Sequence, residues 1–205
     1  MIKSISGIRG TIGGLVGDSF TPIDIVKFTS AYAKFILDQN NTSKKIIVGR
    51  DARISGKFVS DLVCGTLVGC GFDVVDVGLS TTPTIEVSVQ REKASGGIIL
   101  TASHNPKQWN ALKLLNNKGE FISSKDGLKI LELAEKNDYH FSTIDKIGSL
   151  SFDNSQNDKH IEDVLNLNLV NIDLIKSKNF KVVVDAVNST GGILVPKLLE
   201  KLGVE

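Results

Sequence analysis

Apolar and polar positions follow two different periods along the first two thirds of the chain. A helical period, with apolar residues roughly every three to four positions, covers residues 21–38, 57–70, 82–93 and 123–135. Short runs of β-branched residues or leucine lie between them and predict buried strands at 45–49, 72–77, 96–101 and 112–115. This order predicts an α/β fold with a mixed, mainly parallel sheet and helices on both faces.

Capping signals mark the ends of several predicted helices. Thr21 can accept hydrogen bonds from free N–H groups of the first helix, and Pro22 suits its first position. A second Thr-Pro pair opens the helix at residue 82, and Gly71 ends the helix before it. These signals favour helices over strands in the same segments.

The last third of the chain has a different pattern. Residues 138–159 are polar and predict a linker with one edge strand at 147–152, followed by a helix at 160–176. A buried strand at 180–185, a turn at 188–192 and a helix at 194–202 are then expected. We therefore divide the chain into a domain at 1–150 and, at 151–205, a linker with the truncated start of a second α/β domain. One strand with two helices buries little apolar surface, so we expect a longer natural protein.

Composition and charge exclude several classes of protein. Of the 205 residues, 41% are hydrophobic and 23% charged, the balance of a soluble globular protein. Lys and Arg number 24 against 23 acidic residues, a net charge of +1, so we expect neither a nucleic acid nor a membrane partner. The first residues lack the apolar stretch of a signal peptide, which favours a cytoplasmic protein. Cys64 and Cys70 fit no metal or redox spacing and are expected to be buried, reduced thiols.

Ser103 lies in a polar loop directly after a predicted strand, where open α/β sheets usually bind ligands. No Gly-x-Ser-x-Gly elbow surrounds it, which disfavours a serine hydrolase. Neither a Walker A motif nor a Gly-x-Gly-x-x-Gly motif after a strand occurs, which disfavours a nucleotide-binding domain. Ser103 either caps a turn or carries chemistry.

The hexapeptide Thr-Ala-Ser-His-Asn-Pro at 101–106 resembles the active-site signature of the α-D-phosphohexomutases. This resemblance implies that Ser103 is phosphorylated, gives its phosphoryl group to a sugar monophosphate and recovers one from the resulting sugar bisphosphate. Such an ester divides one hard transfer into two easier ones. The resemblance extends over residues 1–150, and the Val-Val-Val-Asp run at 182–185 continues it.

Further residues take candidate roles from the same resemblance. Arg9, in Ser-Gly-Ile-Arg-Gly-Thr at 6–11, corresponds to a loop arginine that approaches the active site, and two neighbouring glycines favour a sharp turn there. Lys113 corresponds to a lysine of acid-base chemistry, although an unperturbed lysine titrates near ~10.4. His104 either contacts the phosphate or supports the loop. Supporting roles are expected for four more residues: Arg50, Asp51, Arg53 and Asn110.

Two residues depart from the common pattern of the family. Ser6 stands where many members carry aspartate, and Ala111 where many carry glycine. Both departures could alter the support of the loops, but neither removes Ser103, Lys113 or Arg9.

The resemblance also implies Mg²⁺, with an oxygen of phosphorylated Ser103 as one ligand. The family's Asp-Gly-Asp-Gly-Asp-Arg magnesium loop does not occur in these 205 residues, so we expect the fragment alone to be inactive. Within the family the sequence favours a phosphoglucosamine mutase, with phosphomannomutase/phosphoglucomutase as the rival. A non-catalytic sugar-phosphate-binding module is the alternative from another class, and the oligomeric state stays open.

Overall fold

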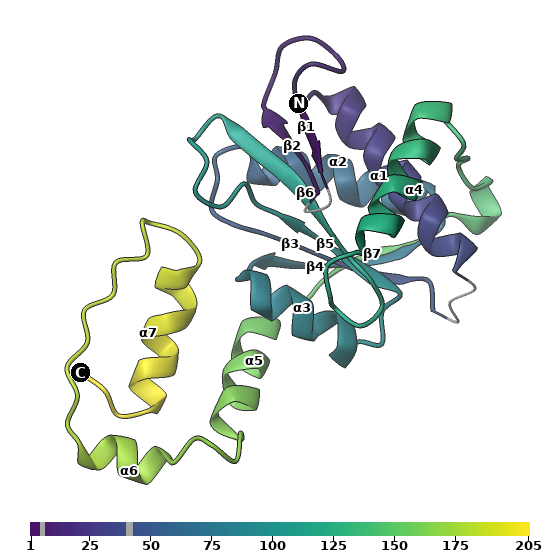
Figure 1. Cartoon of the computed structure of the whole chain (residues 1–205). Coiled ribbons are helices and arrows are strands. Elements are labelled where there is room, and N and C mark those ends of the chain that lie inside the picture. The colour runs from purple at the N-terminus through teal and green to yellow at the C-terminus, as the bar shows by residue number, and fades with distance from the viewer. Residues whose placement is uncertain (5–6, 40–42) are drawn as a thin grey trace.

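A computed structural model describes residues 1–4, 7–39 and 43–205. Within these ranges seven strands form one sheet in the order β1-β2-β6-β5-β3-β4-β7 (Figure 1). Strands β5, β3, β4 and β7 pair in parallel, and β1, β2 and β6 extend the sheet through antiparallel pairs, so three of the six pairings are parallel. The predicted α/β fold with a mixed sheet is confirmed. The strands are β1 Ile2–Ser4, β2 Gly7–Thr11, β3 Lys45–Arg50, β4 Asp73–Leu79, β5 Gly96–Leu100, β6 Trp109–Leu115 and β7 Leu150–Phe152.

The helices of the first part begin where their capping signals predict. Thr21 accepts a hydrogen bond from the Asp24 N–H, and the Asp24 carboxylate accepts one from the Thr21 N–H at 3.2 Å, which makes a reciprocal cap. Ser123 accepts from the Asp126 N–H at the start of the fourth helix. The helices are α1 Pro22–Asp38, α2 Gly56–Gly69, α3 Thr82–Arg91, α4 Ser124–Lys136, α5 Gln156–Leu165, α6 Ile172–Ser177 and α7 Gly191–Lys201.

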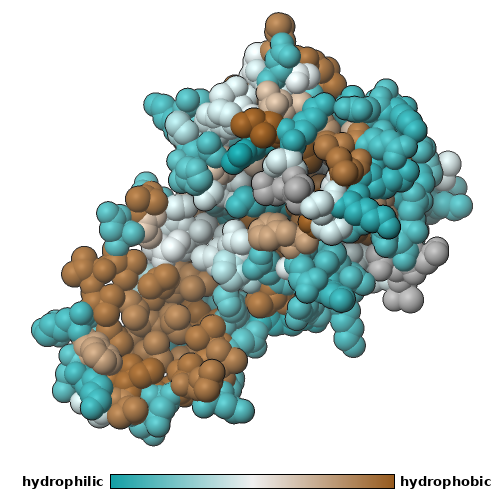
Figure 2. All heavy atoms as spheres, in the orientation of Figure 1, coloured by the Kyte–Doolittle hydropathy of each residue, from teal (hydrophilic) through white to brown (hydrophobic). Residues whose placement is uncertain are grey.

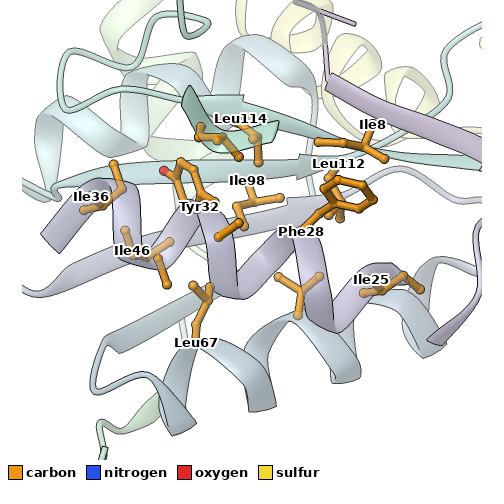
Figure 3. Close-up of a cluster of buried hydrophobic side chains, with 14 of the residues drawn as sticks. Ile8, Ile25, Phe28, Tyr32, Ile36, Ile46, Leu67, Ile98, Leu112 and Leu114 are labelled. Carbon is orange, nitrogen blue, oxygen red and sulfur yellow. The ribbon is translucent and has the colours of Figure 1, made fainter. Parts of the chain in front are cut away.

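Helices cover both faces of the sheet and leave its core between them. Helices α1, α2 and α4 pack on one face, where Phe28 and Tyr32 are fully enclosed (Figure 3). The Tyr32 hydroxyl donates to the Leu115 carbonyl at 2.7 Å, and burial raises the pKa of this hydroxyl. Helix α3 covers the other face, with Ile85 and Val89 packed in a second buried cluster. The core of the fold therefore consists of two apolar layers, one on each face of the sheet.

The thiols of Cys64 and Cys70 are free and buried, as predicted. Burial raises the pKa of Cys64 to about 12, with the Asp76 carboxylate adding to the rise. Such a thiol is inert near neutral pH. No helix of the described ranges is both long and apolar enough to cross a membrane.

The expected turn at residues 6–11 is wrong, because Gly7–Thr11 forms strand β2, which joins β1 to β6. Ile8 is buried in the core while its neighbour Arg9 is half-buried on the opposite face, which is the alternation of a strand. Because Gly7 and Gly10 have no side chains, this alternation of apolar and polar side chains is not visible in the sequence. Ser6 lies outside the described residues.

The last third departs most from the prediction. The single helix expected at 160–176 is two helices, α5 and α6, and Asn171 caps the second by accepting from the Leu174 N–H at 2.9 Å. The edge strand expected at 147–152 is confirmed in part, as β7 pairs with β4.

The buried strand expected at 180–185 is wrong, because this segment is exposed and forms no strand, and Val183 is 99% exposed. A buried strand needs neighbours on both sides. Within the described chain the segment's pairing is with Glu205, through the Val182 N–H and the Phe180 carbonyl. Figure 2 shows apolar surface gathered over this part of the molecule.

A partly buried histidine lies in the contact of helix α5 with α3. His160 Nδ1 lies 2.9 Å from the Thr84 hydroxyl, and burial, with Arg91 nearby, lowers the pKa of His160 below its usual value of 6.5. The unfolded chain therefore takes up this proton more readily than the folded one. The contribution of neutral His160 to the free energy of unfolding is fully present above pH 6.5. It is lost as the pH decreases from that value through the lower pKa of the folded state.

We expect the free energy of unfolding in urea to fall between about pH 7.5 and 5.5, and the fall to shrink in His160→Gln. Ser155 holds the pKa of Asp153 well below its usual range, and Lys45 lowers that of Glu92, so both carboxylates lose their contribution only in stronger acid. An unchanged pH profile in His160→Gln would contradict this assignment.

Candidate active site

The loop at 101–107 leaves the carboxyl end of β5, beside the end of β3. The Asp51 N–H, directly after β3, donates to the Leu100 carbonyl at 3.1 Å, which joins the two strand ends. Thr101 and Ala102 are buried, whereas Ser103 and His104 are exposed. The structure thus presents Ser103 to solvent on a base that is anchored in the sheet.

Thr101 sets the backbone conformation of Ser103. The Thr101 hydroxyl donates to Asp51 Oδ2 at 2.6 Å and accepts from the Ser103 N–H at 3.0 Å. Ser103 has a φ of +54°, in the left-handed region of backbone conformation that residues other than glycine seldom adopt. Such conformations persist where surrounding contacts fix them, and they gather at functional sites.

Arg53 holds the outside of the same loop. Its guanidinium donates to four backbone carbonyls, those of Ser103 at 2.6 Å, Asn105 at 2.7 Å, Pro106 at 2.9 Å and Trp109 at 3.0 Å. Its Nε pairs with Asp51 Oδ2 at 3.2 Å, and both side chains are largely buried. One planar cation therefore fixes the loop from one end to the other.

Arg9 and Lys113 approach Ser103 from the antiparallel part of the sheet. Arg9 on β2 lies opposite Ala111 on β6, and Lys113 lies two residues further along β6, so both side chains are on the α3 face. Gly7 allows the two strands to come this close, since a Cβ there would stand 2.1 Å from the Leu112 carbonyl oxygen. Together with the loop, these residues line a cavity of about 170 Å³.

The cavity of about 170 Å³, called the smaller cavity below, contains two buried polar atoms that have no hydrogen-bond partner in the described chain. These atoms are Arg9 Nε and Asn105 Oδ1. One is a charged donor and the other an acceptor. Buried polar groups are usually paired, so an unpaired donor and acceptor at one cavity indicate a polar ligand or water there. The donor suits an anion and the acceptor a hydroxyl group.

Lys113 has an aromatic and an acidic neighbour. Its Nζ lies 5.9 Å from the centre of the Phe121 ring. Burial raises the pKa of Glu86 on α3, and the charge of Lys113 opposes the rise. The Lys113 ammonium group thus has the Glu86 carboxylate within its electrostatic reach.

A larger cavity of about 680 Å³ lies on the other side of the loop. Asp51, Arg53 and Lys107 line it from the first part of the chain, and the turn at 187–189 lines it from the last part. Ser103, His104 and Asn105 border both cavities. The serine therefore stands between a small cavity with two basic side chains and a larger, more open one.

The structure brings six of the eight predicted site residues to these cavities: Arg9, Asp51, Arg53, Ser103, His104 and Lys113. The Asn110 side chain lies on the other face of the sheet from Arg9 and Lys113, where its Nδ2 donates to the Ser55 hydroxyl at 2.9 Å. Arg50 donates to the Asp51 carbonyl at 3.3 Å and packs beside Gly56.

The sequence reasoning did not single out Thr101, Asn105 or the turn at 187–189. The first two lie in the hexapeptide that drew attention to Ser103. The turn could not have been found from spacing, because it reaches the site only through the fold.

The described residues do not complete a metal site. Within them no group of three or more His, Cys, Asp or Glu side chains is placed to hold a metal ion. Asp51, the acid beside Ser103, is engaged by Arg53 and Thr101. The exposed Ser103 side chain offers an oxygen at both cavities.

The chain is thus an α/β domain that carries a serine loop at the carboxyl edge of its sheet, with two basic side chains beside it. The family described as phosphoglucomutase/phosphomannomutase, alpha/beta/alpha domain I, matches residues 2–141, and the chain belongs to this family.

Relatives and solved structures agree with this membership. The chain is 33% identical over 196 residues to a phosphoglucomutase/phosphomannomutase of Thermococcus kodakarensis, covering 95% of this chain and 42% of the relative. It is 33% identical over 198 residues to a phosphoglucosamine/phosphogalactosamine mutase of Sulfurisphaera tokodaii, with the same two coverages. A crystal structure of a family protein from Burkholderia thailandensis superposes with a TM-score of 0.80 at 23% identity, covering 98% of this chain and 42% of the other, and supports the fold. The chain thus spans less than half the length of these proteins.

Proposed function

We propose that this chain carries the phosphoserine half of a sugar-phosphate mutase, in which Ser103 holds the phosphoryl group between two transfers to and from a hexose or hexosamine phosphate. The observation that carries the proposal is the placement of an exposed serine, in a fixed left-handed conformation, beside a cavity with the unpaired Arg9 Nε. A phosphoserine brings about 1.5–2 negative charges, which need nearby cations. Arg9 and Lys113 supply them.

Each residue then takes a role that its contacts support. When Ser103 Oγ attacks a sugar bisphosphate, an Oγ–P bond forms, the bond from phosphorus to the sugar oxygen breaks, and the hydroxyl proton ends on that oxygen. Lys113 or His104 carries this proton. Asn105 Oδ1 accepts from a sugar hydroxyl, and Arg53 and Asp51 keep the loop in place.

Two further assignments rest on the family. Magnesium would bind an oxygen of phosphorylated Ser103, with its other ligands outside the described residues. We favour a hexosamine phosphate as substrate over mannose or glucose phosphate, in line with the Sulfurisphaera relative's name. The division of the chain near residue 150 and the inactivity of these 205 residues alone remain predictions.

The decisive experiment is peptide mapping by mass spectrometry of the protein isolated from its own cells. We expect a phosphoryl group on Ser103 that glucosamine 6-phosphate removes faster than mannose 6-phosphate does. Ser103→Ala is expected to abolish the modification completely, because among the residues that the structure describes Ser103 is the one serine that borders both cavities. A serine that stays unmodified, and accepts no phosphate from a sugar bisphosphate with magnesium, would favour a sugar-phosphate-binding module instead.

A further inference from the structure

Helix α5 lies between α3 of the first part of the molecule and α7 of the last part (Figure 1). The turn at 187–189, which borders the larger cavity opposite Ser103, comes directly before α7. The width of that cavity therefore depends on how α5 is held on α3 and how α7 is held on α5. The two contacts differ in kind.

The contact between α5 and α3 centres on one buried side chain, Gln156, whose polar groups are all hydrogen-bonded. Gln156, at the start of α5, is 0% exposed. Its Oε1 accepts from the Ser88 hydroxyl at 3.0 Å and from Arg91 Nη1 at 2.7 Å, and its Nε2 donates to Glu92 at 3.1 Å and Asp153 at 2.8 Å. A buried amide with every group satisfied fixes one arrangement, since each partner left alone would cost free energy.

A neighbouring contact strengthens this anchor. Asn157 Nδ2 donates to the Leu79 carbonyl at 2.8 Å, at the carboxyl end of β4. The first turn of α5 is therefore bound to the first part of the molecule.

The contact between α5 and α7 is held largely by exposed ion pairs. Asp158 and Glu162, four residues apart on α5, pair with Lys197 and Lys201, four residues apart on α7. All four side chains are 45% to 57% exposed. Exposed pairs contribute little and weaken with salt. Leu194 is the buried apolar side chain of α7.

We propose that Gln156 is a positioning residue that fixes α5 to the first part of the molecule, and that the α5–α7 contact is the joint at which the turn at 187–189 moves relative to Ser103. The inference rests on the difference between the two contacts: the Gln156 amide is buried with all its hydrogen bonds made, whereas the ion pairs between α5 and α7 are exposed. It deepens the proposed function, because the joint would set the space available to a sugar phosphate beside Ser103.

Nitroxide labels on the 205-residue chain test the anchor directly. Exposed cysteines introduced by Lys125→Cys on α4 and Asn166→Cys after α5 report on the α5–α3 contact, and Glu200→Cys on α7 reports on the joint. The two natural thiols are buried and label slowly. Pairwise distances are then measured by double electron–electron resonance.

We expect Gln156→Glu to abolish the single narrow distance between positions 125 and 166, because a carboxylate would replace the amide donor facing Glu92 and Asp153. Adding Asp153→Asn is expected to restore it, since the new amide can donate to the introduced carboxylate. A narrow distance retained in Gln156→Glu would overturn the anchor. Ser88→Ala, which removes one donor to Gln156, repeats the test if Gln156→Glu fails to fold.

The proposed joint between α5 and α7 is tested with substitutions of exposed lysines, which leave the core unchanged. Lys197→Gln with Lys201→Gln, or salt near 1 M where the screening length is about 3 Å, should broaden the distance from 125 to 200 and leave that from 125 to 166 narrow. Broadening of both distances, or of neither, would overturn the joint. The readout needs no phosphoryl transfer, so its failure and that of the mutase proposal are distinguishable.

Discussion

Replacing Arg53 with leucine is expected to lower the free energy of unfolding by about 3 kcal/mol and to release the Ser103 loop. The change removes one partner of a largely buried ion pair, which typically costs about 3–5 kcal/mol, and it leaves Asp51 without its cation. Four loop carbonyls lose their donor at the same time, although water can reach some of them. Urea denaturation measures the loss, and proteolysis within 103–109 measures the release of the loop.

Arg50→Leu is the matched control. Arg50 stands three residues earlier, and its guanidinium makes one long hydrogen bond of 3.3 Å to the Asp51 carbonyl. We expect a cost near 1 kcal/mol, the usual net value of one hydrogen bond, and no new cleavage in the loop. Equal losses for the two variants would show that the four carbonyl contacts of Arg53 do not stabilise the loop.

The regular elements of the first part could be predicted because local signals and burial agree. In α1 the Thr-Pro cap, the helical period and a buried face all indicate the same element. In β3 a β-branched run fits a strand that is covered on both faces. Such elements need little information from distant residues.

The wrong predictions have a common physical cause: the conformation of these segments depends on pairing with strands that are distant in the sequence. Strand β2 has two glycines and a charged residue in five positions, and it is a strand because β1 and β6 pair with it. Residues 180–185 have strong β-branched character, yet without strands on both sides they form none. Propensity states what a segment can do, and pairing decides it.

The candidate site shows the same division. Ser103, Lys113 and Arg9 were found through family resemblance, and composition or period would not have separated them from other serines and cations. The fold adds what a sequence pattern does not contain, namely the hydrogen bond from the Thr101 hydroxyl to Asp51 and the four carbonyls around Arg53. These contacts join residues about fifty positions apart, so they exist only once the sheet has formed.

Gly7→Ala is expected to lower the free energy of unfolding by about 2–5 kcal/mol, the sum of backbone strain and overpacking. Gly7 has a φ of +116°, and a Cβ there would stand 2.1 Å from the Leu112 carbonyl oxygen, so β2 must move away from β6. Arg9, two residues along β2, would then leave the smaller cavity, and we expect phosphate to protect the variant less against urea than it protects the parent chain.

Gly13→Ala separates the two causes. Gly13 also has a positive φ, +89°, but a Cβ there meets nothing within 4 Å. Its cost should therefore be the conformational strain alone, about 1–2 kcal/mol, with phosphate protection unchanged. If both variants lose the same stability and the same protection, the close approach of β2 to β6 does not hold Arg9 at the cavity, and the assignment of Arg9 to the phosphoryl group loses its structural basis.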